Sequence, residues 1–263
     1  MNILDKIVEY KKREVEQNKK NVPEAKLQSS ELFGRKVISF THALSNPSGT
    51  GIIAEFKRRS PSKGVINGNA DVVKVTEAYA SNGAAALSVL TDSNFFGGSN
   101  DDLIKARVNN IPILRKDFII DEYQLLEAKS IGADVILLIA ACLSPAEVKR
   151  LSTFAKGLGL EVLLEIHNHE ELEHICDECD VVGVNNRDLK SFTVDINRSI
   201  ELSENIPSGK IKISESGITD TDTILRLRNH GFKGFLIGEN FMKQEDPSIA
   251  FASFVKHLKT VPM

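Results

Sequence analysis

Tryptophan is absent from this chain of 263 residues, and cysteine occurs only three times. An odd number of cysteines in a chain of this length does not suggest a secreted disulfide framework. No apolar run approaches the roughly 20 residues of a transmembrane helix, and the longest, residues 135–143, is typical of a buried strand. The first residues mix acidic with basic side chains and lack the apolar core of a signal peptide. We therefore expect a cytoplasmic protein.

The chain also has little net charge, because 33 basic and 36 acidic residues leave a formal value of −3. That balance gives no electrostatic reason to expect nucleic acid or a membrane surface as a partner. Hydrophobic residues make up 41% and charged residues 26%, which is ordinary for a globular protein and excludes wholesale disorder. We expect a monomer whose partner is a small molecule.

What the chain does have is a regular alternation of short aliphatic runs with helical stretches. Near-continuous hydrophobic runs of this length are typical of buried parallel strands. Several of the helical stretches end in glycine, the residue that most easily stops a helix in the left-handed conformation. The eight runs are 51–57, 85–91, 111–118, 134–141, 161–167, 181–187, 210–216 and 234–238.

Eight similar strand–helix units in one series favour closure of the sheet into a barrel. No linker or change of composition divides them, and the glycine fingerprint of a dinucleotide fold is missing after the first strand. Residues 3–15 carry apolar residues at helical spacing among lysines and glutamates, which predicts an amphipathic helix. The sequence thus predicts an α/β protein of one domain: a (β/α)8 TIM barrel over 49–263 with a helical extension over 1–48.

Charged or amide residues stand at the ends of five predicted strands. Barrel enzymes carry their chemistry at the carboxyl ends of the strands, and residues two apart on a strand share a face. One polar strand end is ordinary, but five with both signs of charge indicate a site, since unpaired charges crowded into a barrel mouth are costly. These ends carry Glu55 and Lys57, Lys116, Glu165, Asn185 and Arg187, and Glu215.

Two small-residue turns follow the seventh and eighth strands, at Ser216–Gly217 and Gly238–Glu239. Backbone N–H groups there, with a short helix N-terminus, form the usual phosphate site of this fold. The pair of turns predicts a phosphorylated small molecule as the ligand.

Metal sites are weakly supported by the sequence. Cys176 and Cys179 resemble half of a zinc or redox motif but have no second cysteine pair. Glu165, His167 and His169 alternate, yet His169 falls in a loop. We predict no metal and no cofactor.

The strand ends, in this order, resemble those of the indole-3-glycerol-phosphate synthases, a family of tryptophan biosynthesis. The resemblance extends over essentially the whole chain, and its first and third motifs are highly specific. The matching segments are 53–62 (IAEFKRRSPS), 90–92 with 95–99 (FFGGS), 112–118 (PILRKDF), 164–167 (LEIH), 183–189 (GVNNRDL), 215–218 (ESGI) and 236–239 (LIGE).

The resemblance implies that the chain closes the indole ring of 1-(2-carboxyphenylamino)-1-deoxyribulose 5-phosphate, releasing CO2 and water. Lys116 would protonate the ribulose carbonyl oxygen, and Glu165 would assist the dehydration. Lys57 would be a second proton donor or a contact to the substrate; the division of acid work between the two lysines stays open. Glu55 would orient Lys57 or the anilino nitrogen. Asn185, Arg187 and Glu215 would position the substrate's carboxylate and hydroxyl groups.

The same resemblance implies the binding residues. Phe96, Phe118 and Leu189 would form an apolar slot for the benzene ring, and Ser60 would also contact the substrate. The phosphate would lie against Ser216, Gly217, Gly238 and Glu239, with Glu239 contributing its backbone N–H because its carboxylate would repel the anion.

Other functions fit part of this pattern. Other phosphate-binding barrels of the tryptophan and histidine pathways are related, but their strand ends do not require the paired lysines of the E-x-K and L-x-K-D-F motifs. A Schiff-base aldolase would use Lys116 or Lys57 as a nucleophilic amine, and borohydride trapping would reveal it. A non-catalytic barrel that only binds a sugar phosphate is a further alternative, and the intact set of acidic and basic residues argues against it.

Overall fold

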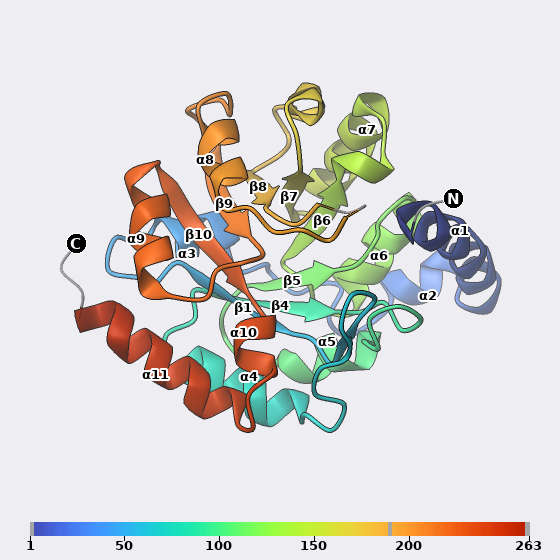
Figure 1. The fold of residues 1–263 in the computed structure, drawn as a ribbon. Helices are drawn as coiled ribbons and strands as arrows, with labels where there is room; N and C mark the ends of the chain where they lie inside the picture. The colour runs from blue at the N-terminus through green and yellow to red at the C-terminus, as the bar shows by residue number, and fades with distance from the viewer. Residues whose placement is uncertain (1–2, 189–190, 261–263) are drawn as a thin grey trace.

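The computed structural model describes residues 3–188 and 191–260 and shows eight parallel strands closed into a barrel (Figure 1). This confirms the predicted (β/α)8 architecture. Each strand pairs with its neighbours in chain order, and the last pairs with the first through Ile52 and Phe235. The strands are β1 (Ile52–Phe56), β4 (Ala86–Leu90), β5 (Ile113–Lys116), β6 (Val135–Ile139), β7 (Glu161–Ile166), β8 (Val181–Asn185), β9 (Ile211–Glu215) and β10 (Phe232–Ile237).

Helices surround the barrel, and polar caps start most of them. Asp121 and Ser144 each form a capping box, so that two backbone N–H groups of the first turn are satisfied at once. Gly83, Gly132, Gly159 and Gly231 have positive φ angles at helix ends, as predicted. The surrounding helices are α4 (Val72–Ser81), α5 (Asn100–Ala106), α6 (Glu122–Ser130), α7 (Pro145–Gly157), α8 (Asn197–Ser203), α9 (Thr221–Asn229), α10 (Glu239–Met242) and α11 (Pro247–Thr260).

One strand–helix unit differs from the regular pattern. Between β7 and β8 the described chain forms only a short 3-10 helix, η2 (Glu170–His174), where the eightfold pattern predicted an α-helix. Only residues 167–180 connect the two strands, and they must also return the chain to the start of β8. That leaves too few residues for a full covering helix, so this side of the barrel has a compact loop instead.

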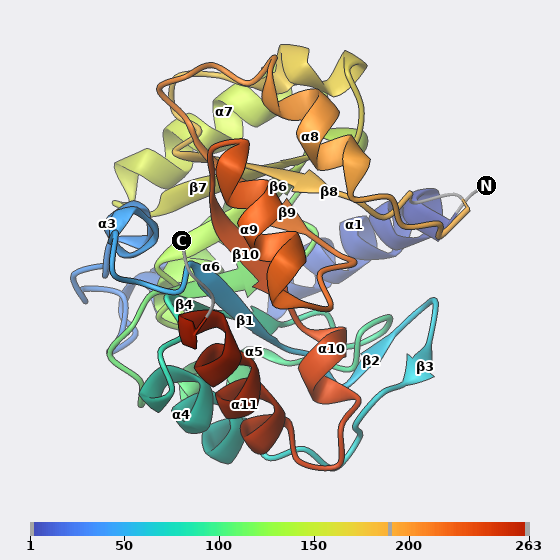
Figure 2. The same cartoon turned by 60° about the vertical axis from the view of Figure 1, so that its left-hand side comes forward.

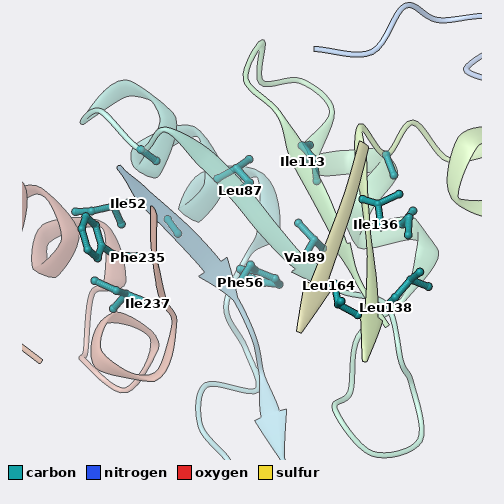
Figure 3. Close-up of a cluster of buried hydrophobic side chains, with 14 of the residues drawn as sticks. Ile52, Phe56, Leu87, Val89, Ile113, Ile136, Leu138, Leu164, Phe235 and Ile237 are labelled. Carbon is teal, nitrogen blue, oxygen red and sulfur yellow. The ribbon is translucent and has the colours of Figure 1, made fainter. Parts of the chain in front are cut away.

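Alternating side chains divide each strand between two layers. The outward layer packs under the helices, and Figure 3 shows part of it, including Ile52, Leu87 and Leu164. The inward layer fills the barrel itself. It contains Phe40, Leu44, Ile53, Ala86, Leu114, Val135, Leu137, Ile139, Leu163, Val181, Ile213 and Leu236. Inward residues at the carboxyl ends of the strands therefore lie above a layer of buried apolar side chains.

From residue 3 onward, three helices precede β1: α1 (Ile3–Asn21), α2 (Glu24–Gln28) and α3 (Phe40–Ser45). In Figure 1, α1 lies beside the barrel next to α6 and away from α11. Helix α3 packs against the end of the barrel opposite the carboxyl ends of the strands, and its residues Phe40 and Leu44 belong to the interior cluster. A small hairpin, β2 (Arg59–Ser60) with β3 (Gly64–Val65), projects after β1 (Figure 2). None of the described helices is both long and apolar enough to cross a membrane.

Candidate active site

The ammonium group of Lys116 lies at the centre of the barrel mouth. Lys116, the last residue of β5, has its Nζ 2.9 Å from Oε2 of Glu165 on β7 and 2.6 Å from Oε2 of Glu215 on β9. All three side chains point inward because each stands two residues beyond an inward-facing apolar residue of its strand. Burial lowers the pKa of Lys116, but the negative charges of Glu165, Glu215 and Glu55 outweigh it and raise that pKa. Lys116 is therefore a cation at neutral pH.

The two carboxylates beside Lys116 are perturbed in opposite directions. Burial and the charge of Glu165 raise the pKa of Glu215 to about 7, against the opposing effect of Lys116. Burial also acts to raise the pKa of Glu165, but Lys116 and His167 outweigh it and hold that pKa below its usual range. The site thus contains one firmly ionised carboxylate and one that titrates near neutral pH, an arrangement suited to proton transfer.

A second ion pair lies next to the first. Nζ of Lys57 is 2.5 Å from Oε1 of Glu55, the last inward-facing residue of β1. Gly238 makes room for this carboxylate, because a Cβ at that position would lie 2.5 Å from Oε1 and 2.8 Å from Cβ of Glu55. Gly183 does the same for Glu215, since its Cβ would overlap Oε1 of that side chain. The two glycines are therefore required by the carboxylates above them.

Asn185 and Arg187 complete the polar side of the mouth. Nδ2 of Asn185 donates to Oε1 of Glu165 at 3.2 Å, and Oδ1 of Asn185 accepts the backbone N–H of Arg187 at 3.0 Å. The guanidinium of Arg187 lies 3.4 Å from the carboxylate of Glu239. Asn185 thus fixes Glu165 and the start of the following loop together.

An apolar wall faces these charges. The rings of Phe96 and Phe118 are 5.9 Å apart and inclined by 37°. Ile3, Leu4 and Ile7 of α1 line the same cavity. The sequence predicted α1 only as an amphipathic helix, because an apolar stripe looks the same whether it packs on the core or lines a site.

A smaller pocket adjoins the cavity at the ends of β9 and β10. Residues 216–219 and 237–240 line it, together with the cations Lys57, Arg187 and Lys243. Ser216 has a φ of 68° and Gly217 of 79°, so two successive left-handed residues turn the chain sharply beside Glu215. A left-handed serine is costly, and such strain clusters at functional sites. This pocket coincides with the two turns that predicted a phosphate.

The structure brings nearly all of the predicted site residues to this pair of pockets, and Ser60 also lines the larger one. Leu189 lies outside the described residues. Two groups besides the apolar stripe of α1 are not among the predicted catalytic or binding residues: the sequence does not single out Lys11, and it presents His167 only as a weak metal candidate. Lys11 of α1 is buried against Asp92 and Asp117, and His167 lies 3.2 Å from both Glu165 and Glu171. Only the position of His167 two residues beyond Glu165 could have pointed to one of them.

The weak metal candidates have other contacts. Cys176 and Cys179 are free thiols with their sulfurs 3.4 Å apart, and His174 contacts the backbone oxygen of Leu143. Within residues 3–188 and 191–260, no group of three or more potential metal ligands is arranged around a common point.

Comparison with known proteins agrees with this geometry. The family model described as "Indole-3-glycerol phosphate synthase" matches residues 4–254. The chain belongs to the indole-3-glycerol phosphate synthase family. A relative of that name from Bacteroides thetaiotaomicron is 46% identical over 259 residues, which cover 98% of this chain and 99% of the relative. Relatives of the same name from Salinibacter ruber and Bordetella pertussis are 42% and 40% identical, covering 96% and 97% of this chain and 94% and 99% of their own.

Membership of the indole-3-glycerol phosphate synthase family agrees with the resemblance seen in the motifs. The match begins within α1 and ends within α11, so it includes both the helical extension and the whole barrel. Every strand end that carries a candidate catalytic residue falls inside it.

Proposed function

We propose that this chain converts 1-(2-carboxyphenylamino)-1-deoxyribulose 5-phosphate into indole-3-glycerol phosphate, CO2 and water, as a carboxy-lyase. The observation that carries the proposal is the Lys116 ammonium held between two buried carboxylates, opposite an apolar wall and beside a smaller pocket that three cations and two carboxylates line. The first offers a proton, the second accommodates a benzene ring, and the third accommodates a phosphate. Family membership selects the reaction among those that need all three.

Ring closure joins the carboxylated ring carbon of the substrate to its ribulose carbonyl carbon. As that bond forms, the carbonyl oxygen gains negative charge and takes a proton from an ammonium donor. Lys116 suits this role because its neighbouring carboxylates keep it protonated until the carbonyl oxygen becomes basic enough to take the proton. Loss of CO2 then leaves its electron pair in the ring and restores aromaticity.

Dehydration requires a second proton for the departing hydroxyl group and a base for one proton of the methylene carbon beside the nitrogen, so that the C=C bond of the indole forms and its N–H is retained. Glu165 is ionised and oriented by Asn185, which suits it to assist this step. Lys57, paired with Glu55, is the other ammonium within the mouth and the second candidate donor. Glu215 and Arg187 would position the hydroxyl and carboxylate groups.

Binding would use the two pockets. Phe96 and Phe118 would hold the benzene ring, with Ser60 at the edge of the same cavity. The turns at Ser216–Gly217 and Gly238–Glu239 would receive the phosphate through backbone N–H groups. The carboxylate of Glu239 is already turned to Arg187 and Lys63, at 3.4 and 3.7 Å.

The test is the appearance of indole fluorescence when purified protein meets this substrate, with a chelator present because we propose that no metal or cofactor is needed. Lys116→Ala should lower kcat by roughly 10²-fold or more, the usual scale for one general acid. Lys149→Ala is the matched control, since Lys149 is exposed and pairs with Glu178 away from the mouth. Wild-type protein without product would overturn the function, and an active Lys116→Ala variant would overturn the role of that lysine.

A Schiff-base aldolase requires a neutral lysine, and the raised pKa of Lys116 disfavours it. Borohydride added during turnover should therefore leave Lys116 and Lys57 unmodified in a peptide mass map. A substrate-sized adduct on either residue would favour the aldolase instead.

We further propose that the chain acts as a monomer in the cytoplasm, with no nucleic acid or membrane as a partner. Light scattering coupled to gel filtration should give a mass near the 29.0 kDa of one chain. A stable mass of twice that value would contradict the monomer.

A further inference from the structure

His167 follows β7 and lies between two carboxylates. Its Nδ1 is 3.2 Å from Oε2 of Glu171 and hydrogen-bonds to it, and its Nε2 is 3.2 Å from Oε1 of Glu165, an ion-pair contact without the alignment of a hydrogen bond. The backbone N–H of His167 donates to that same oxygen of Glu171 at 2.7 Å. The side chain is only 8% exposed, so both contacts are shielded from solvent.

Glu171 is itself held in place from within the loop. Its Oε1 accepts from Nδ2 of Asn168 at 3.0 Å, and its backbone N–H donates to Oδ1 of Asn168 at 3.1 Å. Because both oxygens of Glu171 are engaged, the imidazole of His167 is fixed on its outer side. Its inner side must then face Glu165.

The two carboxylate oxygens of Glu165 contact different neighbours. Oε1 faces His167 and Asn185, and Oε2 faces Lys116. We propose that His167 is a positioning residue for the ring-closing reaction: its imidazolium, braced by Glu171, fixes Glu165 with Oε2 turned toward Lys116 and the substrate. This inference rests on the proposed function of the site.

The charges around His167 support a cation at this position. Burial lowers its pKa, but Glu165 and Glu171 outweigh that effect and raise the pKa to about 9. Beyond them, the Cys142 thiol of η1 (Ala140–Cys142) is kept neutral, since burial, Glu165, Glu171 and Asp5 of α1 all raise its pKa. Among these groups, His167 is the cation on the outer side of Glu165.

That second cation matters when Lys116 acts as an acid. Once the N–H bond of Lys116 breaks and the proton forms an O–H bond with the substrate, the charge facing Oε2 of Glu165 is lost. His167 then remains as the charge that keeps Glu165 ionised and oriented for the next step. A neutral side chain at position 167 would leave Glu165 free to take a proton at that moment.

The test compares His167→Gln with His174→Gln. Gln keeps a hydrogen-bond donor but cannot carry the charge. His174 is the matched control because it is buried to the same degree, on the same loop, and contacts only the Leu143 carbonyl among the contacts described. His167→Gln should lower kcat by about tenfold or more while KM stays within about threefold, since orientation rather than binding is lost. It should also remove a decline in kcat near pH 9 that wild type and His174→Gln share.

Glu171→Gln provides a second variant in case His167→Gln does not fold. It should move the decline in kcat to lower pH, because a carboxylate that raises the pKa of His167 has been removed. Equal kcat and equal pH profiles for all three variants and wild type would overturn the inference.

A readout without turnover separates this inference from the proposed function. An NMR titration of the His167 ring should give a pKa of about 9 in wild type and a lower value in Glu171→Gln. A pKa near the ordinary value of 6.5 would overturn the proposal that Glu171 holds His167 as a cation, even if the enzyme is active. Wild-type protein that makes no product would overturn the proposed function, and with it the role in ring closure, whatever the titration gives.

Discussion

Replacing Lys11 by methionine tests how the N-terminal helix is fastened to the barrel. The Lys11 side chain is 1% exposed, and its Nζ lies 3.0 Å from both Asp92 and Asp117, at the ends of β4 and β5. Glu14, one turn later on α1, pairs with the same ammonium at 2.5 Å. Methionine keeps most of the side chain's length and apolar surface, so the change removes mainly the charge.

The expected cost is large because only one partner of a buried cluster is lost. Removing one member of a buried ion pair typically costs about 3–5 kcal/mol, since the remaining charge stays buried. Asp117 keeps Arg115 and Thr91 as partners, and Asp92 keeps the backbone N–H groups of the next turn. We therefore expect a value near the lower end, about 3 kcal/mol. For a domain of this size that corresponds to a fall in Tm of roughly 6–12 °C.

Thermal unfolding followed by circular dichroism measures this effect, with Lys12→Met as the control. Lys12 is the next residue and is exposed, so the same substitution there should change Tm by less than about 1 °C. Because α1 also lines the cavity, Lys11→Met should raise KM more than it lowers kcat. If Lys11→Met and Lys12→Met unfold at the same temperature, the buried cluster does not fasten the helix and the reasoning is refuted.

Three further outcomes are expected. Gly183→Ala should push Glu215 away from its lysine partner and lower kcat at least tenfold with little loss of Tm, and an unchanged kcat would show that the carboxylate has room to move. The folded state raises the pKa of His167 from 6.5 to about 9, so its stabilisation is complete below pH 6.5 and is lost as pH rises through 9. The difference in the free energy of unfolding between wild type and His167→Gln should thus shrink from pH 6 to pH 10 in urea titrations, and a constant difference would contradict the assignment. Asp134→Asn should leave the buried guanidinium of Arg107 without its charged partner and cost about 3 kcal/mol in the same titrations, with kcat retained.

The barrel and the inward carboxylates could be predicted because a strand has only two faces. Once the run 51–57 is taken as a strand, Glu55 and Lys57 must share a side, and they form an ion pair there. The same alternation places Lys116, Glu165 and Glu215 around one point, although they are far apart in the sequence. Periodicity therefore carries most of the information about this site.

What the sequence could not predict depends on loops and on docking. The regular alternation of strands and helices predicts an α-helix after β7, but the connection is long enough only for the short η2 helix. That turn brings the carboxylate of Glu171 to the imidazole of His167. Lys11 looks like any exposed lysine of a charged helix until α1 docks over Asp92 and Asp117. Neither contact follows from a local pattern, because each joins a side chain to a surface whose position is set by the whole fold.

The packed interior of the barrel also determines by which route substrate enters the site and products leave it. Directly beneath the charged layer, Ile53, Leu114, Leu163 and Ile213 are fully buried, and Phe40 closes the floor. Water therefore has no route to the carboxylates from below. On the proposed reaction, substrate must enter and CO2, water and product must all leave by the same opening, past α1 and the loop after β1. Movements of α1 or of the loop after β1 would therefore change the rates of substrate entry and product release together, whereas substitutions within the barrel interior would not.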